Sequence, residues 1–169
     1  MIRLYFTGKN NPLGRLIGAG TGGFEYHHVG AAVSIPPFTE GDLVSAHWQD
    51  GVQVRKDADE GGWTHWAYVD IPCTDDQAQQ AAQWLKSQVG KRYAMGAIFE
   101  MVWRVLTSCG APSYWPTRWI CSGVMTQMLV EVGLYPSIKP IPIRLYTPRD
   151  IFVLSLAIPG ARWIARTRP

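Results

Sequence analysis

Within the first 71 positions of the chain, several short runs alternate between apolar and other residues with the period of β-strands. Three short runs rich in β-forming residues show this alternation and stop at turn-forming residues; they are residues 2–6, 28–35 and 63–71. Two further runs, 43–48 and 52–55, flank Asp50-Gly51, and this dipeptide is a strong hairpin signal. The pattern therefore predicts three to five strands in this part of the chain.

Beyond residue 72 the apolar positions recur at helical spacing. Thr74 and Gln77 have the spacing of a capping box, and Gly90 is the expected end of the helix that follows. Further helices are predicted over 95–106, over 121–132 and from Thr147-Pro148, and a closing strand over 162–166. Strands followed by helices indicate an α+β fold rather than alternating βαβ units.

Composition narrows the class of protein. With 169 residues, 47% apolar and 17% charged, the chain is expected to form a single domain over 1–169 and is not typical of a disordered protein. A net charge of +3 gives no reason to expect nucleic acid as a partner. No apolar stretch is long enough to span a bilayer, and no secretory signal is visible, so we expect a cytoplasmic protein without a transmembrane segment.

The three cysteines are few enough to consider one by one. Cys73, Cys109 and Cys121 are an odd number without CxxC spacing, which suggests neither a disulfide framework nor a structural zinc site. Cys121 stands where a loop becomes a helix, so the N–H groups and dipole of the helix terminus can lower the pKa of its thiol. We expect Cys121 to be the most reactive cysteine. The alternative is a buried, inert cysteine.

A thiol nucleophile needs a base, and four histidines are available: His27, His28, His47 and His65. His28 begins a predicted strand and shares a face with Gly30, which leaves space beside the imidazole for a substrate. His47 and Ser45 share a face of a later strand, and either could hold His28 in the required tautomer. A zinc site built from histidine and cysteine is a further interpretation, but no ligand pair has compact spacing. We expect no cofactor and no metal.

These residues carry a resemblance to a known family. The segment from Tyr26 to Val33, YHHVGAAV, resembles the histidine strand of the circularly permuted NlpC/P60 (YiiX-like) group of papain-like cysteine hydrolases, and WICSGVM, residues 119–125, resembles its Cys-Ser helix start. The order agrees, because His28 precedes Cys121 as permutation requires. GKRY, residues 90–93, resembles the tyrosine segment of the same group.

The resemblance implies a papain-like α+β fold with an antiparallel sheet packed against helices, and a peptidase or amidase. Cys121 would be the nucleophile, His28 the base and His47 the orienting residue, with Tyr93 and Ser45 at the substrate or oxyanion position. Where relatives carry an acid, this chain has Ser45-Ala46, so Ser45 remains an alternative to His47.

The implied partner is a peptide or acyl substrate, foremost the stem peptide of peptidoglycan. Alternatives are an acyl or lipid hydrolase or acyltransferase on the same fold, and a noncatalytic papain-like binding module of a phage particle. A protein of that kind would be virion-associated or released by lysis.

Overall fold

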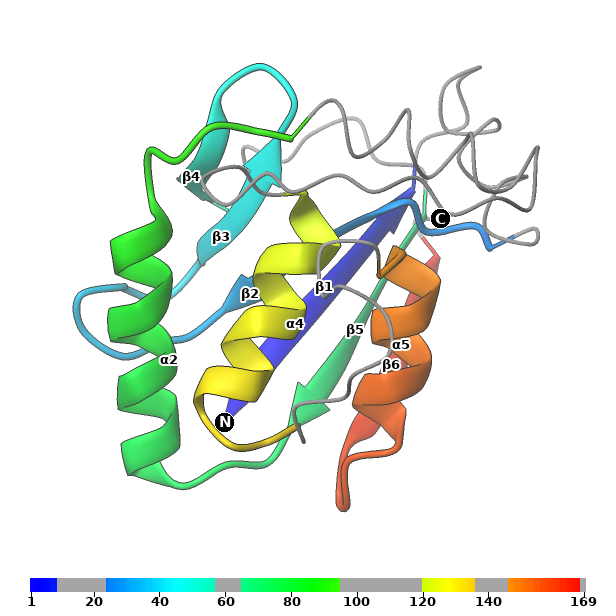
Figure 1. Ribbon diagram of the computed structural model, residues 1–169. Helices are drawn as coiled ribbons and strands as arrows, with labels where there is room; N and C mark the ends of the chain where they lie inside the picture. Colours follow the sequence, from blue (N-terminus) through cyan, green and yellow to red (C-terminus); the bar gives the residue numbers. More distant parts are fainter. Residues whose placement is uncertain (9–23, 57–64, 95–119, 136–145, 168–169) are drawn as a thin grey trace.

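Strand β1 (Ile2–Gly8) lies inside a six-stranded antiparallel sheet whose strand order is β4-β3-β2-β1-β5-β6 (Figure 1). The computed structural model describes residues 1–8, 24–56, 65–94, 120–135 and 146–167. The other strands are β2 (His28–Ala32), β3 (Asp42–His47), β4 (Gly51–Lys56), β5 (His65–Ile71) and β6 (Arg162–Thr167). The predicted α+β class, the five strands before residue 72, the hairpin and the closing strand are confirmed.

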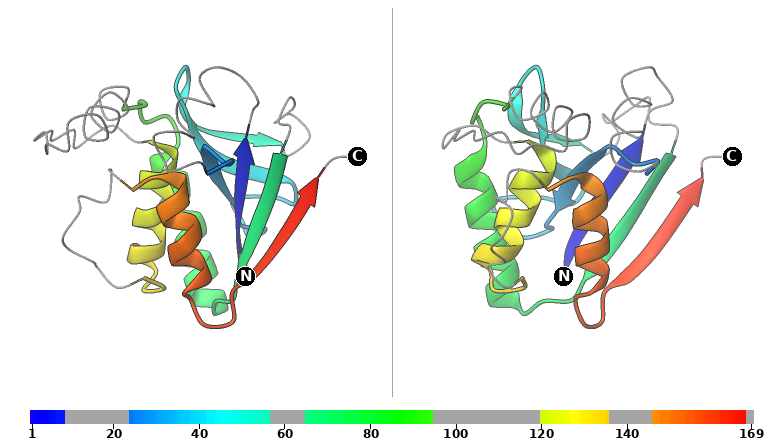
Figure 2. Two further views of the ribbon diagram at one scale, coloured as in Figure 1. Left: turned by 90° about the vertical axis from the view of Figure 1, so that its right-hand side faces the viewer. Right: turned by 45° about the vertical axis from the view of Figure 1, so that its right-hand side comes forward.

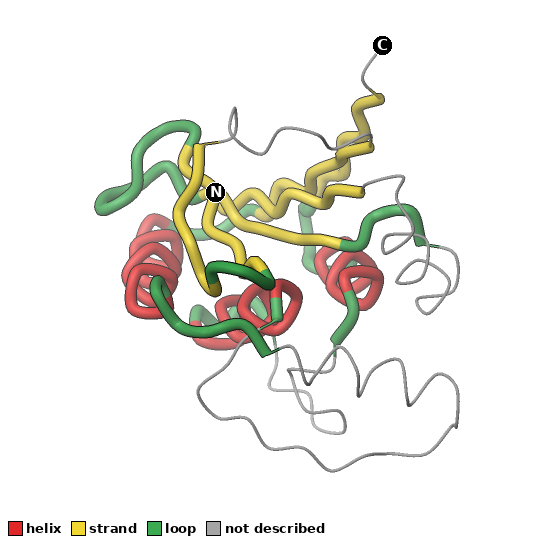
Figure 3. The backbone as a smooth tube through the Cα atoms, turned by 90° about the horizontal axis from the view of Figure 1, so that it is seen from above, coloured by secondary structure: helices red, strands yellow, loops and turns green. Residues whose placement is uncertain are grey.

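Three helices are described, and all lie on one face of the sheet (Figures 2 and 3). They are α2 (Asp75–Gln88), α4 (Cys121–Glu131) and α5 (Pro148–Leu156). Capping boxes begin α2 at Thr74 and α5 at Thr147, as the spacing of their polar residues requires. None of these helices is both long and apolar enough to cross a bilayer. The helix predicted over 95–106 lies outside the described residues.

Alternation along the strands gives the sheet two different faces. The face toward the helices carries fully buried apolar side chains, among them Ile2, Leu4, Phe6, Val29, Ala31 and Val69. They pack against Leu85 of α2, Met125 of α4 and Ile151 of α5, and burial of one such side chain contributes about 1.5–3 kcal/mol. This core fixes the position of α4, and therefore of Cys121, against the sheet.

The opposite face carries polar and aromatic side chains. Arg3 makes two hydrogen bonds of 2.6 and 2.8 Å to the carboxylate of Asp70, and its guanidinium lies 4.1 Å from the ring centroid of Tyr68. Tyr5 and Trp66 stack beside them, with ring centroids 6.5 Å apart. These contacts tie β1 to β5 on the face that the described helices leave open.

Strand β2 is shorter than the sequence pattern predicts. It ends at Ala32, whereas the alternation of apolar residues continues to Ile35. Val33 remains buried, but the backbone of Ile35 closes a turn, because its N–H bonds the carbonyl of Val33 and its carbonyl accepts from Phe38. Buried and exposed side chains continue to alternate beyond the last hydrogen bond between β2 and its neighbouring strands. The sequence pattern therefore predicts a longer strand than the one that forms.

Candidate active site

The candidate residues converge at one end of the sheet. Helix α4 begins at Cys121, β2 begins at His28 and β3 ends at His47, all at the upper end of the sheet in Figure 1. The segment that carries Tyr93 leaves α2 and reaches the same end. Residues from four separate stretches of sequence are therefore assembled around the start of α4.

The first turn of α4 leaves its backbone donors available to the thiol. Its N-cap, Ile120, has extended backbone and makes no side-chain capping bond, and the first turn has no acidic residue. The N–H groups of Cys121 and Ser122 hydrogen-bond the thiol instead, and each of these bonds lowers the pKa of Cys121. The Ser122 hydroxyl donates to the carbonyl of Tyr146, which ties this turn to the residue before the α5 cap.

The thiol is nevertheless protonated at rest. Cys121 is only 5% exposed, and burial, the largest influence, raises its pKa above the ordinary value. The N–H of Val29, the two helix N–H groups and the Tyr93 hydroxyl all act in the opposite direction but do not outweigh burial. The expectation of a lowered thiol pKa is therefore wrong for the resting protein, because the sequence shows the helix start but not the depth at which it is buried.

Tyr93 is held against Cys121 by strand β4. The N–H of Val52 donates to the carbonyl of Lys91 at 2.9 Å, and the N–H of Gly90 donates to the carbonyl of Val52 at 2.8 Å. Gly51 has φ +76°, and a Cβ there would lie 2.2 Å from the Lys91 carbonyl oxygen, so only glycine allows this approach. Burial and the neighbouring Cys121 raise the pKa of Tyr93 well above its usual range, so the hydroxyl keeps its proton and can donate it.

The structure brings His28, His47 and Ser45 together. The rings of His28 and His47 have centroids 4.9 Å apart and planes inclined by 38°. Gly30 pairs with Ser45, and the same register continued by two residues sets His28 against His47. Ser45 is fully buried, and its hydroxyl lies 2.6 Å from Nε2 of His47. The two residues considered as alternative partners of His28 thus bind each other.

Cys121 contacts the backbone at the start of β2. The backbone N–H that bonds its sulfur belongs to Val29, and therefore to the peptide bond that follows His28. Because successive side chains of a strand point to opposite faces, Val29 points toward α4 and the side chain of His28 points to the other face of β2. The thiol is therefore bonded to the backbone beside His28, whose side chain begins on the opposite side of β2.

Sequence reasoning missed one residue of this region, Thr7. It is the direct cross-strand partner of His28 in β1, and it is 6% exposed. Directly paired residues of antiparallel strands share a face, so Thr7, His28 and His47 form a row across three strands. Cross-strand register is not visible in a single sequence, and a lone threonine in a short strand gives no other signal.

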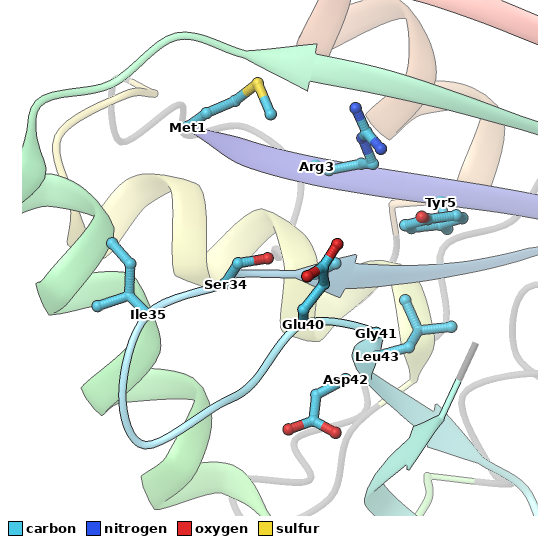
Figure 4. Close-up of a pocket in the computed structure, with 10 residues that line it drawn as sticks. Met1, Arg3, Tyr5, Ser34, Ile35, Glu40, Gly41, Asp42 and Leu43 are labelled. Atoms are coloured by element: carbon cyan, nitrogen blue, oxygen red, sulfur yellow. The ribbon is translucent and has the colours of Figure 1, made fainter. Parts of the chain in front are cut away.

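A pocket of about 390 Å³ lies elsewhere, on the open face of the sheet (Figure 4). Arg3, Tyr5, Ala32, Glu40 and Asp42 contribute to its lining. Ala32 is the last residue of β2 and His28 the first, about 13 Å apart at the usual rise of a strand. The pocket is therefore separate from the cysteine and the two histidines.

These elements define a class of α+β protein in which a cysteine begins a helix that packs on an antiparallel sheet beside a histidine strand. Among solved structures, the chain is similar to the crystal structure of the metalloprotein yiiX from Escherichia coli O157:H7 (DUF1105), with a TM-score of 0.65 and 17% sequence identity, covering 99% of this chain and 97% of yiiX. At this identity the similarity shows the fold. No family model matches the chain, and no curated protein is similar to it by sequence.

The description of yiiX as a metalloprotein raises the question of a metal here. In the described parts of this chain, no three histidine, cysteine, aspartate or glutamate side chains lie close enough together to hold an ion. His28 and His47 would supply two ligands, whereas a stable protein site usually has three or more. These residues do not fit a metal centre.

Proposed function

We propose that this chain is a cysteine hydrolase of the circularly permuted NlpC/P60 papain-like type, with Cys121 as nucleophile and His28 as base. The observation that carries the proposal is the set of contacts at the Cys121 thiol: helix N–H groups, the Tyr93 hydroxyl and the N–H of Val29, one residue after His28. The resemblance of the cysteine and histidine segments to that group and the yiiX-like fold support it independently.

The raised pKa of Cys121 determines how the thiol would act. A protonated thiol must pass its proton to the base during attack, because no thiolate is formed beforehand. The thiol proton passes to a ring nitrogen of His28 as Sγ bonds the substrate carbonyl carbon. The carbonyl oxygen takes up the negative charge, and the Cys121 N–H and the Tyr93 hydroxyl act as the donors that stabilise it.

The remaining steps return the site to its starting state. The tetrahedral intermediate expels the amine, which takes the proton from His28 and leaves a thioester on Cys121. Water then gives a proton to His28 and attacks the carbonyl carbon of the thioester. The acid product forms, and Sγ leaves as a thiolate that takes the proton back from His28. His47, bonded to Ser45, packs against His28 and fixes the plane of its ring.

The proposed substrate is an amide in a peptidoglycan stem peptide. Acyl transfer from a lipid ester would use the same thioester, and a noncatalytic module would use none. The products formed from a muropeptide and from a phospholipid distinguish the amidase from the lipid-acting enzyme. A noncatalytic module would leave Cys121 unacylated.

The test is labelling of the full chain with a peptidyl acyloxymethyl ketone, an electrophile that requires a catalytic thiol, followed by peptide mapping. We expect label on Cys121 in the wild type, none in Cys121→Ser, and a loss of about 10²–10⁴ in rate in His28→Ala. Cys73→Ser is the matched control and should label as the wild type does. An unlabelled Cys121, or undiminished labelling in His28→Ala, would overturn the proposal.

A further inference from the structure

The hydroxyl of Thr7 is buried in the sheet without a hydrogen bond from the described residues, which is energetically unfavourable. Its Oγ1 has no hydrogen-bond partner among the described residues, although Thr7 is only 6% exposed. A buried polar atom without a partner destabilises the folded state, and nearly all such atoms in proteins are hydrogen-bonded. Valine has almost the same shape and carries no hydroxyl, so the hydroxyl calls for an explanation other than packing.

The position of Thr7 in the sheet supplies one. It pairs directly with His28 of β2, and side-chain Cβ atoms of such pairs lie about 4.5–5.5 Å apart. His47 contacts His28 from the neighbouring strand β3, on the other side of β2, and its Nε2 is bonded to Ser45. His28 therefore lies between a histidine that already binds a serine and a threonine whose hydroxyl is available.

We propose that Thr7 is a positioning residue for His28: its hydroxyl accepts a hydrogen bond from the ring N–H of His28 once the imidazole has taken the thiol proton. This inference rests on the proposed function. Imidazolium has two N–H donors, so while one returns the proton in the proposed mechanism, the other can donate to Oγ1 of Thr7. Rotation about the Cα–Cβ bond of Thr7 is sufficient to turn Oγ1 toward its cross-strand neighbour.

A bond of this kind would form only when charge develops on His28. An interaction present in the transition state but absent from the resting protein lowers the barrier without strengthening substrate binding. That would account for a hydroxyl left without a partner at rest. Among the described residues, His47 from β3 is the titratable group in contact with this ring. The Cys121 thiol, itself bonded by Tyr93, bonds the N–H of Val29, the residue after His28, and Thr7 does not titrate.

The direct test is to measure the pKa of the His28 ring in the full-length protein by ¹⁵N NMR. The variant His28→Gln assigns the signal. Because a hydrogen bond from a charged donor is lost, we expect Thr7→Val to lower this pKa by about one unit, and Thr7→Ser to restore it. The melting temperature of Thr7→Val should be unchanged or higher, since a buried hydroxyl without a partner is removed. If Thr7→Val does not fold, Thr7→Ala takes its place.

Labelling by the peptidyl probe gives the second readout. Thr7→Val should slow the acylation of Cys121 about tenfold, the rate equivalent of one pKa unit, and Thr7→Ser should not. An unchanged His28 pKa in Thr7→Val, or a Thr7→Ser variant as slow as Thr7→Val, would overturn the inference. If the pKa falls but wild-type Cys121 takes no label, the hydrogen bond stands and both its catalytic role and the proposed function are wrong.

Discussion

The hydroxyl of Ser45 lies 2.6 Å from Nε2 of His47, two residues further along the same strand, and the pair adjoins His28. Residues i and i+2 share a face of a strand, so the contact follows from local geometry. Gly30 makes room for it, because a Cβ there would lie 3.0 Å from the Cβ of Ser45. His47 is thus held by its own strand, and its ring lies against that of His28.

Replacing Ser45 by alanine should loosen His47. The lost hydrogen bond corresponds to a fall of about 0.5–1.5 kcal/mol in the free energy of unfolding, and we expect Cys121 labelling to slow several-fold. Ser155→Ala is the matched control, because Ser155 is equally buried and donates to the carbonyl of Phe152 in α5. Denaturant unfolding and probe kinetics measure the two effects. Equal slowing in both variants would show that Ser45 acts through general stability.

The two described cysteines should respond differently to a small alkylating reagent. Burial raises the pKa of Cys121, whereas Cys73 is only partly buried, so iodoacetamide at neutral pH should modify Cys73 first. This reverses the order expected from the helix start alone. Peptide mapping over time measures it, and the peptidyl probe should show the opposite preference. Faster alkylation of Cys121 by iodoacetamide would mean that its thiol is ionised at rest.

Removing the Tyr93 hydroxyl tests its contact with the thiol. Its hydrogen bond lowers the pKa of Cys121, so Tyr93→Phe should raise that pKa further, and alkylation of Cys121 by iodoacetamide, which requires the thiolate, should begin at higher pH. If the hydroxyl also stabilises the oxyanion, turnover falls by as much as about 10²–10³. Tyr135→Phe provides the control, because Tyr135 is buried near Tyr146 instead. A pH profile identical to that of the wild type would remove Tyr93 from the site.

What the sequence predicts well here is local. The capping box at Thr74, the helix start at Thr147-Pro148 and the Asp50-Gly51 hairpin are read from residues within four positions of one another, and the structure confirms each. The chemistry at the thiol is not local. The burial that raises the pKa of Cys121, and the register that sets Thr7 beside His28, depend on residues far apart in the chain. Motif resemblance names candidate residues, but only packing shows their protonation and neighbours.

Asp42, away from the candidate site, makes a contribution to stability that is lost in acid. Lys56 at 2.6 Å, together with the N–H and hydroxyl of Thr39, lowers the pKa of Asp42 to about 2. An unfolded aspartate titrates near 3.9, so this carboxylate stabilises the fold fully above about pH 4, and the contribution is lost as the pH falls toward 2. Asp42→Asn should therefore lower the free energy of unfolding at pH 7, by under about 1 kcal/mol for such an exposed pair, with the difference from wild type vanishing near pH 2.

Asp50→Asn is the control, since it removes the exposed pair with Arg55. Urea unfolding between pH 2 and 7 measures both variants, and a pH-independent difference for Asp42→Asn would contradict the assignment. Because Asp42 lines the separate pocket, its replacement should leave Cys121 labelling unchanged.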